Sequence, residues 1–352
     1  MNLLKHPQYL FLILMMAISA SVIFAPPASL NAEQSQALAL VLVIVPLWAT
    51  GALPEFLVAL VFFLMVILFD LASPAEIFAG FSSTALWLIF AGSIMGMGIK
   101  STGLGDRLAT LLQKILAGSY ERLIIGLVLI GLFLGFLMPS SMGRLVMMLP
   151  IVMALSDRLG FQPGSKGRSG IILATAIGSH IPTVAILPAN IPNMVLSGAA
   201  DSLYGIEFGF TSFLLLHFPV LGLLKAGLLI ALVLWAFPAR ESNAVLANAL
   251  ASKSDQPEPL FPKLNAPQSR MMLILVAALI LWLTDSWHGV NPAWVGLGAA
   301  VLMLLPGVNL VDAEKFNMNV TMLLFIAGIL GIGTLINSTG LGQWLAMQLE
   351  SG

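Results

Sequence analysis

The sequence has no cysteine in 352 residues, and charged residues make up only 9% of it. The first absence excludes disulfide bonds, a thiol nucleophile and a thiolate-bound metal. The second separates the chain from soluble domains, in which about a quarter of the residues are charged. Hydrophobic residues account for 59% of the chain. This composition predicts an all-α polytopic membrane protein.

Neither sign of charge dominates, because the formal net charge is −1. Lys and Arg occur in short clusters between apolar runs and form no long basic stripe, which argues against a nucleic-acid partner. Basic residues between membrane spans mark the cytoplasmic loops. Lys5 therefore places the N-terminus in the cytoplasm, and we expect a multi-pass protein in the lipid bilayer of the cell's inner (plasma) membrane.

Residues that carry out catalysis are also sparse in the apolar runs. We find no His-x-x-x-His motif and no paired aspartates there, so we predict that the protein is not an enzyme and needs no cofactor. The first apolar run, residues 8–25, is expected to be a transmembrane helix within an N-terminal segment 1–34. A signal peptide is the alternative, although the run is long for one and no cleavage site stands out.

One apolar run, residues 123–155, is too long for a single membrane helix of about 20 residues. The segment 139–144, Pro-Ser-Ser-Met-Gly-Arg, interrupts it near the middle. Basic loops stand at both ends, so the positive-inside rule is satisfied if the chain enters the membrane and returns. Arms of about 15 residues reach ~22 Å, less than the ~30 Å hydrocarbon core. We predict a re-entrant helical hairpin over residues 122–157.

A second unusual run, residues 170–200, contains Pro182, Pro188 and Pro192. A continuous helix cannot hold three prolines without losing hydrogen bonds, so we predict a Pro-broken transmembrane helix. Broken helices expose carbonyl groups and half-helix ends that bind ions. The alternative is a kinked helix without a ligand. The polar residues available at this break are Ser179, Thr183, Asn190 and Asn193.

Residues 48–109 and 282–346 share several motifs in the same order. Both contain Trp-x-Thr, a following Pro, an Ala-Gly with later glycines, and an identical Ser-Thr-Gly-Leu-Gly. The predicted topology starts the first copy outside and the second inside, which indicates inverted-topology repeats of the kind found in secondary transporters. The expected divisions are a first repeat over 35–237, a cytoplasmic linker over 238–269 and the beginning of an incomplete second repeat over 270–352.

The second copy stops before any counterpart of the hairpin and the broken helix. An inverted-repeat carrier needs both halves to enclose its site, so we expect a truncated chain or a fragment of a longer carrier. The alternative is a half unit that works by dimerising.

Together these motifs resemble the divalent anion/sodium symporter family, part of a wider ion-transporter superfamily. The resemblance covers about residues 35–352 and rests on residues 48–54, on Trp-Leu-Ile-Phe-Ala-Gly at 87–92, on Ser-Thr-Gly-Leu-Gly, on the Ser-containing tip and on the Pro/Asn-rich break. It implies a secondary active transporter, a symporter or exchanger, that moves a dicarboxylate or sulfate-like anion. It also implies sodium as the coupling ion and a homodimer. The alternatives are a sodium/proton or arsenite-type carrier, or a non-transporting truncated membrane protein.

In that family the hairpin tip reads Ser-Asn-Thr and contacts the substrate carboxylate and a sodium ion. Ser140 matches the Ser, whereas Ser141 and Met142 replace the Asn and the Thr. The departure removes an amide and a hydroxyl from the expected site. The resemblance and the polar break together predict substrate binding by Ser140, Ser141, Gly143, Arg144, Thr183, Asn190 and Asn193. They predict sodium binding by Ser140, Ser141, Ser179, Pro188 and Asn190, and no other metal.

Arg144 is the charged residue nearest the expected tip. A guanidinium within the membrane is costly unless it lines water or pairs with an anion. We expect it to supply the fixed positive charge that a bound sodium supplies elsewhere, and to grip an oxyanion. The alternative is an Arg that snorkels or pairs with a backbone carbonyl. His180 is a candidate for proton coupling; the alternative is a histidine that is simply hydrogen-bonded.

Overall fold

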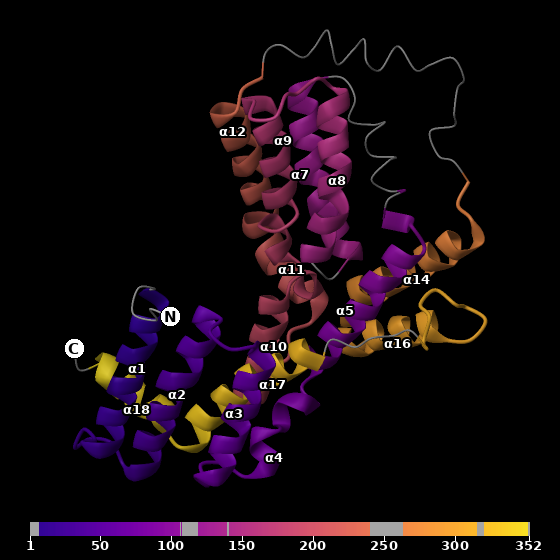
Figure 1. Ribbon diagram of the computed structural model, residues 1–352. Coiled ribbons are helices and arrows are strands. Elements are labelled where there is room, and N and C mark those ends of the chain that lie inside the picture. Colours follow the sequence, from indigo (N-terminus) through magenta and orange to yellow (C-terminus); the bar gives the residue numbers. More distant parts are fainter. Residues whose placement is uncertain are drawn as a thin grey trace, which may run out of the picture. The chain divides into compact units, whose positions relative to one another are not determined.

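The computed structural model describes residues 7–105, 107, 119–138, 141–239, 263–314 and 320–350. These residues form helices and no strand (Figure 1). Six of the described helices are long and apolar enough to cross a membrane. The prediction of an all-α polytopic membrane protein is therefore confirmed. The six are Ala32–Thr50, Thr84–Ser101, Tyr120–Leu137, Phe210–Ala236, Ala266–Leu283 and Val320–Ser338.

The chain divides into two compact units, each drawn from both predicted repeats. The first unit comprises Met1–Leu86, Val195–Glu207 and Asn317–Gly352, and the second comprises Trp87–Met194 and Phe208–Phe316. This division is spatial, so the expected boundaries of the repeats in the sequence stay predictions.

The first unit is built around α3, which packs against α2 and α17. Small residues allow these helices to approach closely. A Cβ atom on Gly328 would lie 3.0 Å from the Trp48 ring, and one on Gly80 would lie 2.8 Å from the Ala327 carbonyl oxygen. The helices of this unit are α1 (Pro7–Phe24), α2 (Ala32–Thr50), α3 (Glu55–Leu68), α4 (Pro74–Ile77), η2 (Ala79–Ser82), α17 (Val320–Ser338) and α18 (Leu341–Glu350). Most of α10 (Ile191–Tyr204) also belongs to it.

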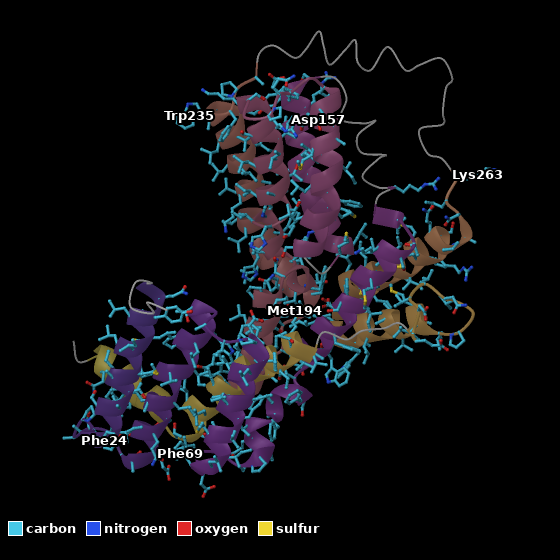
Figure 2. The ribbon with its side chains drawn as sticks, in the orientation of Figure 1. Phe24, Phe69, Asp157, Met194, Trp235 and Lys263 are labelled. Carbon is cyan, nitrogen blue, oxygen red and sulfur yellow. The ribbon has the colours of Figure 1, made fainter. Side chains whose placement is uncertain are left out.

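The second unit contains a bundle in which α7, α8, α9 and α12 lie side by side (Figure 1). Asp157 and Trp235 lie at one end of this bundle, and Met194 lies toward the other (Figure 2). The helices of this unit are most of α5 (Thr84–Ser101), α7 (Tyr120–Leu137), α8 (Ser141–Arg158), α9 (Lys166–Gly178), η3 (Pro182–Ala185), η4 (Leu187–Ala189), α11 (Phe210–His217), η5 (Phe218–Leu224), α12 (Lys225–Ala236), α14 (Ala266–Leu283), α15 (Asp285–His288) and α16 (Pro292–Leu304).

The chain reverses direction between α7 and α8 (Figure 1), as expected for the hairpin. Each arm has 18 residues and is therefore ~27 Å long rather than ~22 Å. The arms are longer because Ser119 caps α7 ahead of the apolar run, and α8 continues through polar residues to Arg158. How deeply the hairpin enters the membrane stays a prediction.

The predicted break in residues 170–200 is present. Helix α9 ends at Gly178 and α10 begins at Ile191, with the short 3₁₀ turns η3 and η4 between them. Pro182 and Pro188 each stand in the first turn of one of these 3₁₀ helices, where the missing N–H costs least.

The Trp and the Thr of the Trp-x-Thr motif make similar hydrogen bonds in the two predicted repeats. The Trp48 indole donates to the Glu55 carbonyl at 3.1 Å, and the Trp282 indole donates to the Pro292 carbonyl at 3.0 Å. In both copies the Thr two residues after the Trp donates back to the carbonyl four residues before it. These parallels agree with a repeat, while its inversion across the membrane stays a prediction.

Candidate functional site

The site is centred on Arg144, in the first turn of α8, where this helix meets the break between α9 and α10. Its side chain is fully buried, with 0% exposed. An Arg almost never reaches this degree of burial unless its donors are all satisfied. The hydrogen bonds of the guanidinium therefore define the site.

Among the described residues, the guanidinium donates to oxygen atoms of three neighbouring segments. Its Nε and Nη2 donate to the Ser179 carbonyl at 3.2 and 2.9 Å, and Nη2 donates to the Thr183 hydroxyl at 2.8 Å. Its Nη1 donates to the Met138 carbonyl, and both terminal nitrogens reach the Ala189 carbonyl at 3.4 Å. We call these four acceptors, from Met138, Ser179, Thr183 and Ala189, the oxygen cage.

The backbone breaks supply the cage with its carbonyl groups. Met138 has an extended backbone, with φ −121° and ψ 104°, as expected for a residue that precedes a proline. Ser179 follows the last residue of α9, and Ala189 ends the second 3₁₀ turn. Carbonyls at such positions have no regular helical partner, so they are free to accept from Arg144.

No carboxylate neutralises this buried charge in the described part of the chain, where the one ion pair joins Arg168 to Asp157. The dipoles of the cage carbonyls take over that role. Convergent backbone carbonyls from an unwound helix are also what binds coupling cations in transporters. The cage is thus built like a cation site, and a side-chain cation occupies it.

A second set of hydrogen bonds ties the hairpin to the break. The Ser141 hydroxyl donates to the Asn190 side-chain oxygen at 3.1 Å, and the Asn190 amide donates to the Thr183 carbonyl at 2.9 Å. Asn190 is only 1% exposed, whereas Ser141 is half-buried. Of Ser141 and Asn190, Ser141 is therefore the side chain that a ligand can reach.

Two further predicted residues bind the backbone in this structure. The Asn193 amide donates to the Val184 and Ile186 carbonyls at 2.9 and 3.0 Å, which holds the two 3₁₀ turns in place. The Ser179 hydroxyl donates to the Thr175 carbonyl at 2.6 Å. Both side chains shape the break.

The remaining predicted residues are placed as follows. Ser140 lies outside the described residues. Gly143 lies half-buried on α8 and Pro188 is buried in η4. His180 is exposed within its unit, and its backbone carbonyl accepts the Thr183 hydroxyl at 2.8 Å. The roles of these residues in substrate, sodium and proton binding stay predictions.

Sequence reasoning missed the backbone acceptors, Met138 and Ala189. Both are signalled by proline, since Met138 precedes Pro139 and Ala189 follows Pro188. It also missed Phe136, whose ring packs against Phe218 with centroids 5.8 Å apart. Phe218 begins the π-helical segment η5, which itself packs against η3. An aromatic residue carries no sequence signal for such a contact.

Comparisons with known proteins relate the chain to one family. Residues 6–352 match the family described as "Sodium:sulfate symporter transmembrane region". A "Membrane protein" of Cupriavidus necator is 28% identical over 271 residues, which are 76% of this chain and 52% of the relative. The "L-tartrate/succinate antiporter" proteins of Escherichia coli K12 and Shigella flexneri are 28% identical over 284 residues, 77% of this chain and 56% of theirs.

The chain spans about half the length of these curated relatives. The family match covers nearly all of it and confirms the resemblance inferred from the motifs. The chain belongs to the sodium:sulfate symporter family.

Proposed function

We propose that this protein takes part in the exchange of small dicarboxylates across the membrane, and that Arg144 replaces a coupling sodium at the hairpin. The observation that carries the proposal is the oxygen cage, which is built like a cation site and holds a guanidinium. The printed names of the Escherichia coli and Shigella relatives, L-tartrate/succinate antiporters, support both exchange and a dicarboxylate.

In this proposal the anion is attracted by a permanent charge. All donors of Arg144 are directed at protein oxygens, so it acts through its field and does not grip the anion directly. The N-termini of α8 and α10 begin beside it at Ser141 and Ile191, and helix N-termini carry partial positive charge. The Ser141 hydroxyl and the first-turn backbone of α8 then contact the carboxylate.

A fixed cation favours exchange over symport. A bound sodium can enter and leave with the substrate, whereas a guanidinium stays on the protein. The empty carrier keeps a buried positive charge with no anion beside it, and reorienting in that state is unfavourable. The carrier then reorients most readily when it has an anion bound on both its inward and its outward movement. We also propose a homodimer, on the family resemblance.

The test is counterflow in proteoliposomes containing the purified protein. Vesicles preloaded with succinate should take up labelled succinate or tartrate, and empty vesicles should not. Replacing sodium by choline should leave the rate unchanged. Uptake into empty vesicles that requires a sodium gradient would identify the protein as a sodium-coupled symporter and contradict the proposal. A sulfate arm of the same assay separates dicarboxylates from sulfate-like anions.

A further inference from the structure

Helices α2 and α14 begin with the same motif, Asn-Ala-x-Gln-Ser, at residues 31–35 and 265–269. Each Asn caps its helix by accepting the backbone N–H of the Gln, at 2.7 Å for Asn31 and 2.9 Å for Asn265. Each Gln side-chain oxygen accepts the backbone N–H of its Asn in return. These are capping boxes, which leave the nitrogen of the Gln side chain free to donate elsewhere.

That nitrogen donates to a Ser-Thr-Gly-Leu-Gly turn. The cap just before the first repeat binds the turn of the second repeat, and the cap just before the second repeat binds the turn of the first. The Gln34 Nε2 donates to the Gly340 carbonyl at 3.4 Å, within the first unit. The Gln268 Nε2 donates to the Thr102 carbonyl at 3.3 Å, within the second unit. The Gly340 carbonyl also accepts the Trp344 backbone N–H of α18 at 3.3 Å, so Gln34 adds a second donor to it. The Thr102 carbonyl lies at the end of α5, where helix carbonyls lack partners in their own helix.

A second hydrogen bond links the same two segments in each of the two contacts. Trp344 and Arg107 occupy the same position after their Ser-Thr-Gly-Leu-Gly motifs. The Trp344 indole donates to the Ser29 hydroxyl at 3.1 Å, and Arg107 donates to the Lys263 carbonyl. Ser29 and Lys263 in turn occupy the same position before their Asn-Ala-x-Gln motifs. Arg107 adds a bond to the Gln268 side-chain oxygen at 2.8 Å.

The geometry of the turns makes them suitable for docking. Gly103 and Gly340 adopt the left-handed conformation, with φ of +66° and +69°. This conformation ends a helix and directs its last carbonyls outward. Near each glycine the nitrogen of the docking Gln side chain approaches the position that a Cβ atom would occupy, at 4.0 Å for Gly103 and 3.5 Å for Gly340.

We infer that the two Ser-Thr-Gly-Leu-Gly turns are a reciprocal pair of docking surfaces, and that the partner each one binds is the Asn-Ala-x-Gln cap that immediately precedes the opposite repeat. We call the two contacts the first clasp (Gln34 with the turn at 338–342) and the second clasp (Gln268 with the turn at 101–105). Gln34 and Gln268 are positioning residues. The first clasp fixes the start of α18, which begins at Leu341 directly after the docked carbonyl.

Hydrogen exchange of the purified full chain, followed by mass spectrometry, tests the reciprocity. In Gln34→Leu we expect the amides of 338–344 to exchange about five- to tenfold faster, the change that follows from losing one hydrogen bond. The amides of 101–105 should not change. Gln268→Leu should give the reverse pattern. Gln36→Leu is the matched control, since no side-chain hydrogen bond of Gln36 is seen among the described residues.

Leu also removes the capping bond of the Gln, so a second variant separates the cap from the clasp. Gln34→Glu keeps the oxygen that closes the capping box and removes only the donor to Gly340, and it should reproduce the faster exchange at 338–344. At the second clasp, Arg107→Met leaves the cap and the Gln268 donor intact and removes the two bonds that Arg107 adds, and it should also speed exchange at 101–105. Three results would overturn the inference. They are faster exchange only around the substituted cap, equal changes in both turns, and no change in either turn. No transport is measured, so its outcome is independent of the proposed exchange.

Discussion

Arg144 carries a charge that is costly to bury in a membrane, and backbone oxygens are placed to accept its hydrogen bonds. Its burial would be prohibitive if its donors were unpaired, yet they all face oxygen atoms of the cage. From the sequence, an anion and a backbone carbonyl were both possible partners of this residue. The structure shows the carbonyl contacts, and the anion enters the proposal only through the charge.

The cage gives Arg144 a direct test at the residue scale. In Arg144→Ser the four oxygens lose their guanidinium and become free to bind a small cation. We therefore expect exchange to fall by at least tenfold without sodium and to recover, at least in part, when sodium is added. The loss expected for one charged, hydrogen-bonded group is about 1.5–3 kcal/mol, which corresponds to that factor.

Sodium titration of counterflow in proteoliposomes measures the effect. Lys166→Ser is the control, because Lys166 is an exposed cation on α9 and lies outside the cage. A loss in Arg144→Ser that no sodium concentration relieves, in a protein that elutes as the parent does, would argue against a cation site beneath the guanidinium.

At the scale of elements, the break between α9 and α10 is maintained by side chains as well as by proline. Asn193 donates to the carbonyls of Val184 and Ile186, and the Ile186 carbonyl also accepts the Ala189 backbone N–H at 3.0 Å. Proline explains why the helix stops. The asparagine explains why the stopped segment keeps one conformation.

Replacing Asn193 by Leu should therefore destabilise the protein. The side chain is 9% exposed. Without it the Val184 carbonyl would lose the Asn193 donor and the Ile186 carbonyl would lose one of its two donors, at a cost of about 1–3 kcal/mol. We expect a lower apparent melting temperature of the purified protein and faster amide exchange in residues 179–190. Asn337→Leu, an exposed position on α17, is the control. Equal melting temperatures for the two variants would contradict the assigned role.

The long helix from Phe210 to Ala236 is less regular than its sequence indicates. The apolar run predicts an ordinary span, whereas residues Phe218–Leu224 are π-helical around Pro219. The irregular segment packs against η3 of the break. A π-helical turn of this kind is rare and frequently found at functional sites, and hydrophobic periodicity does not reveal it.

For the whole molecule, the natural absence of cysteine makes the predicted topology directly testable. The positive-inside rule places the loop at 73–83 outside and the loop around Lys166 in the cytoplasm. In intact cells an impermeant maleimide should label Ala75→Cys. It should label Lys166→Cys only after permeabilisation. Both positions are exposed, so the reverse pattern would show that the predicted orientation is wrong.

More of the fold than of the site could be predicted from the sequence. The spans, the reversal near residue 139 and the break near Pro182 and Pro188 follow from apolar length and from prolines, which act within one or two turns. Of the site, Ser141, Arg144, Ser179, Thr183 and Asn190 were identified because polar residues in apolar runs are conspicuous. The Met138 and Ala189 acceptors were missed, since a carbonyl group is present at every residue.

By itself the sequence determined the class of protein, its family and the places where its helices are interrupted, because composition, proline and motif order act locally. Only the tertiary structure decided which residues the key side chains bind. It directs Arg144 at carbonyls from three separate segments. It also pairs Gln34 with the turn at 338–342 and Gln268 with the turn at 101–105. Those choices depend on which distant parts of the chain meet, and identical turns in the two repeats give the sequence no means of distinguishing them.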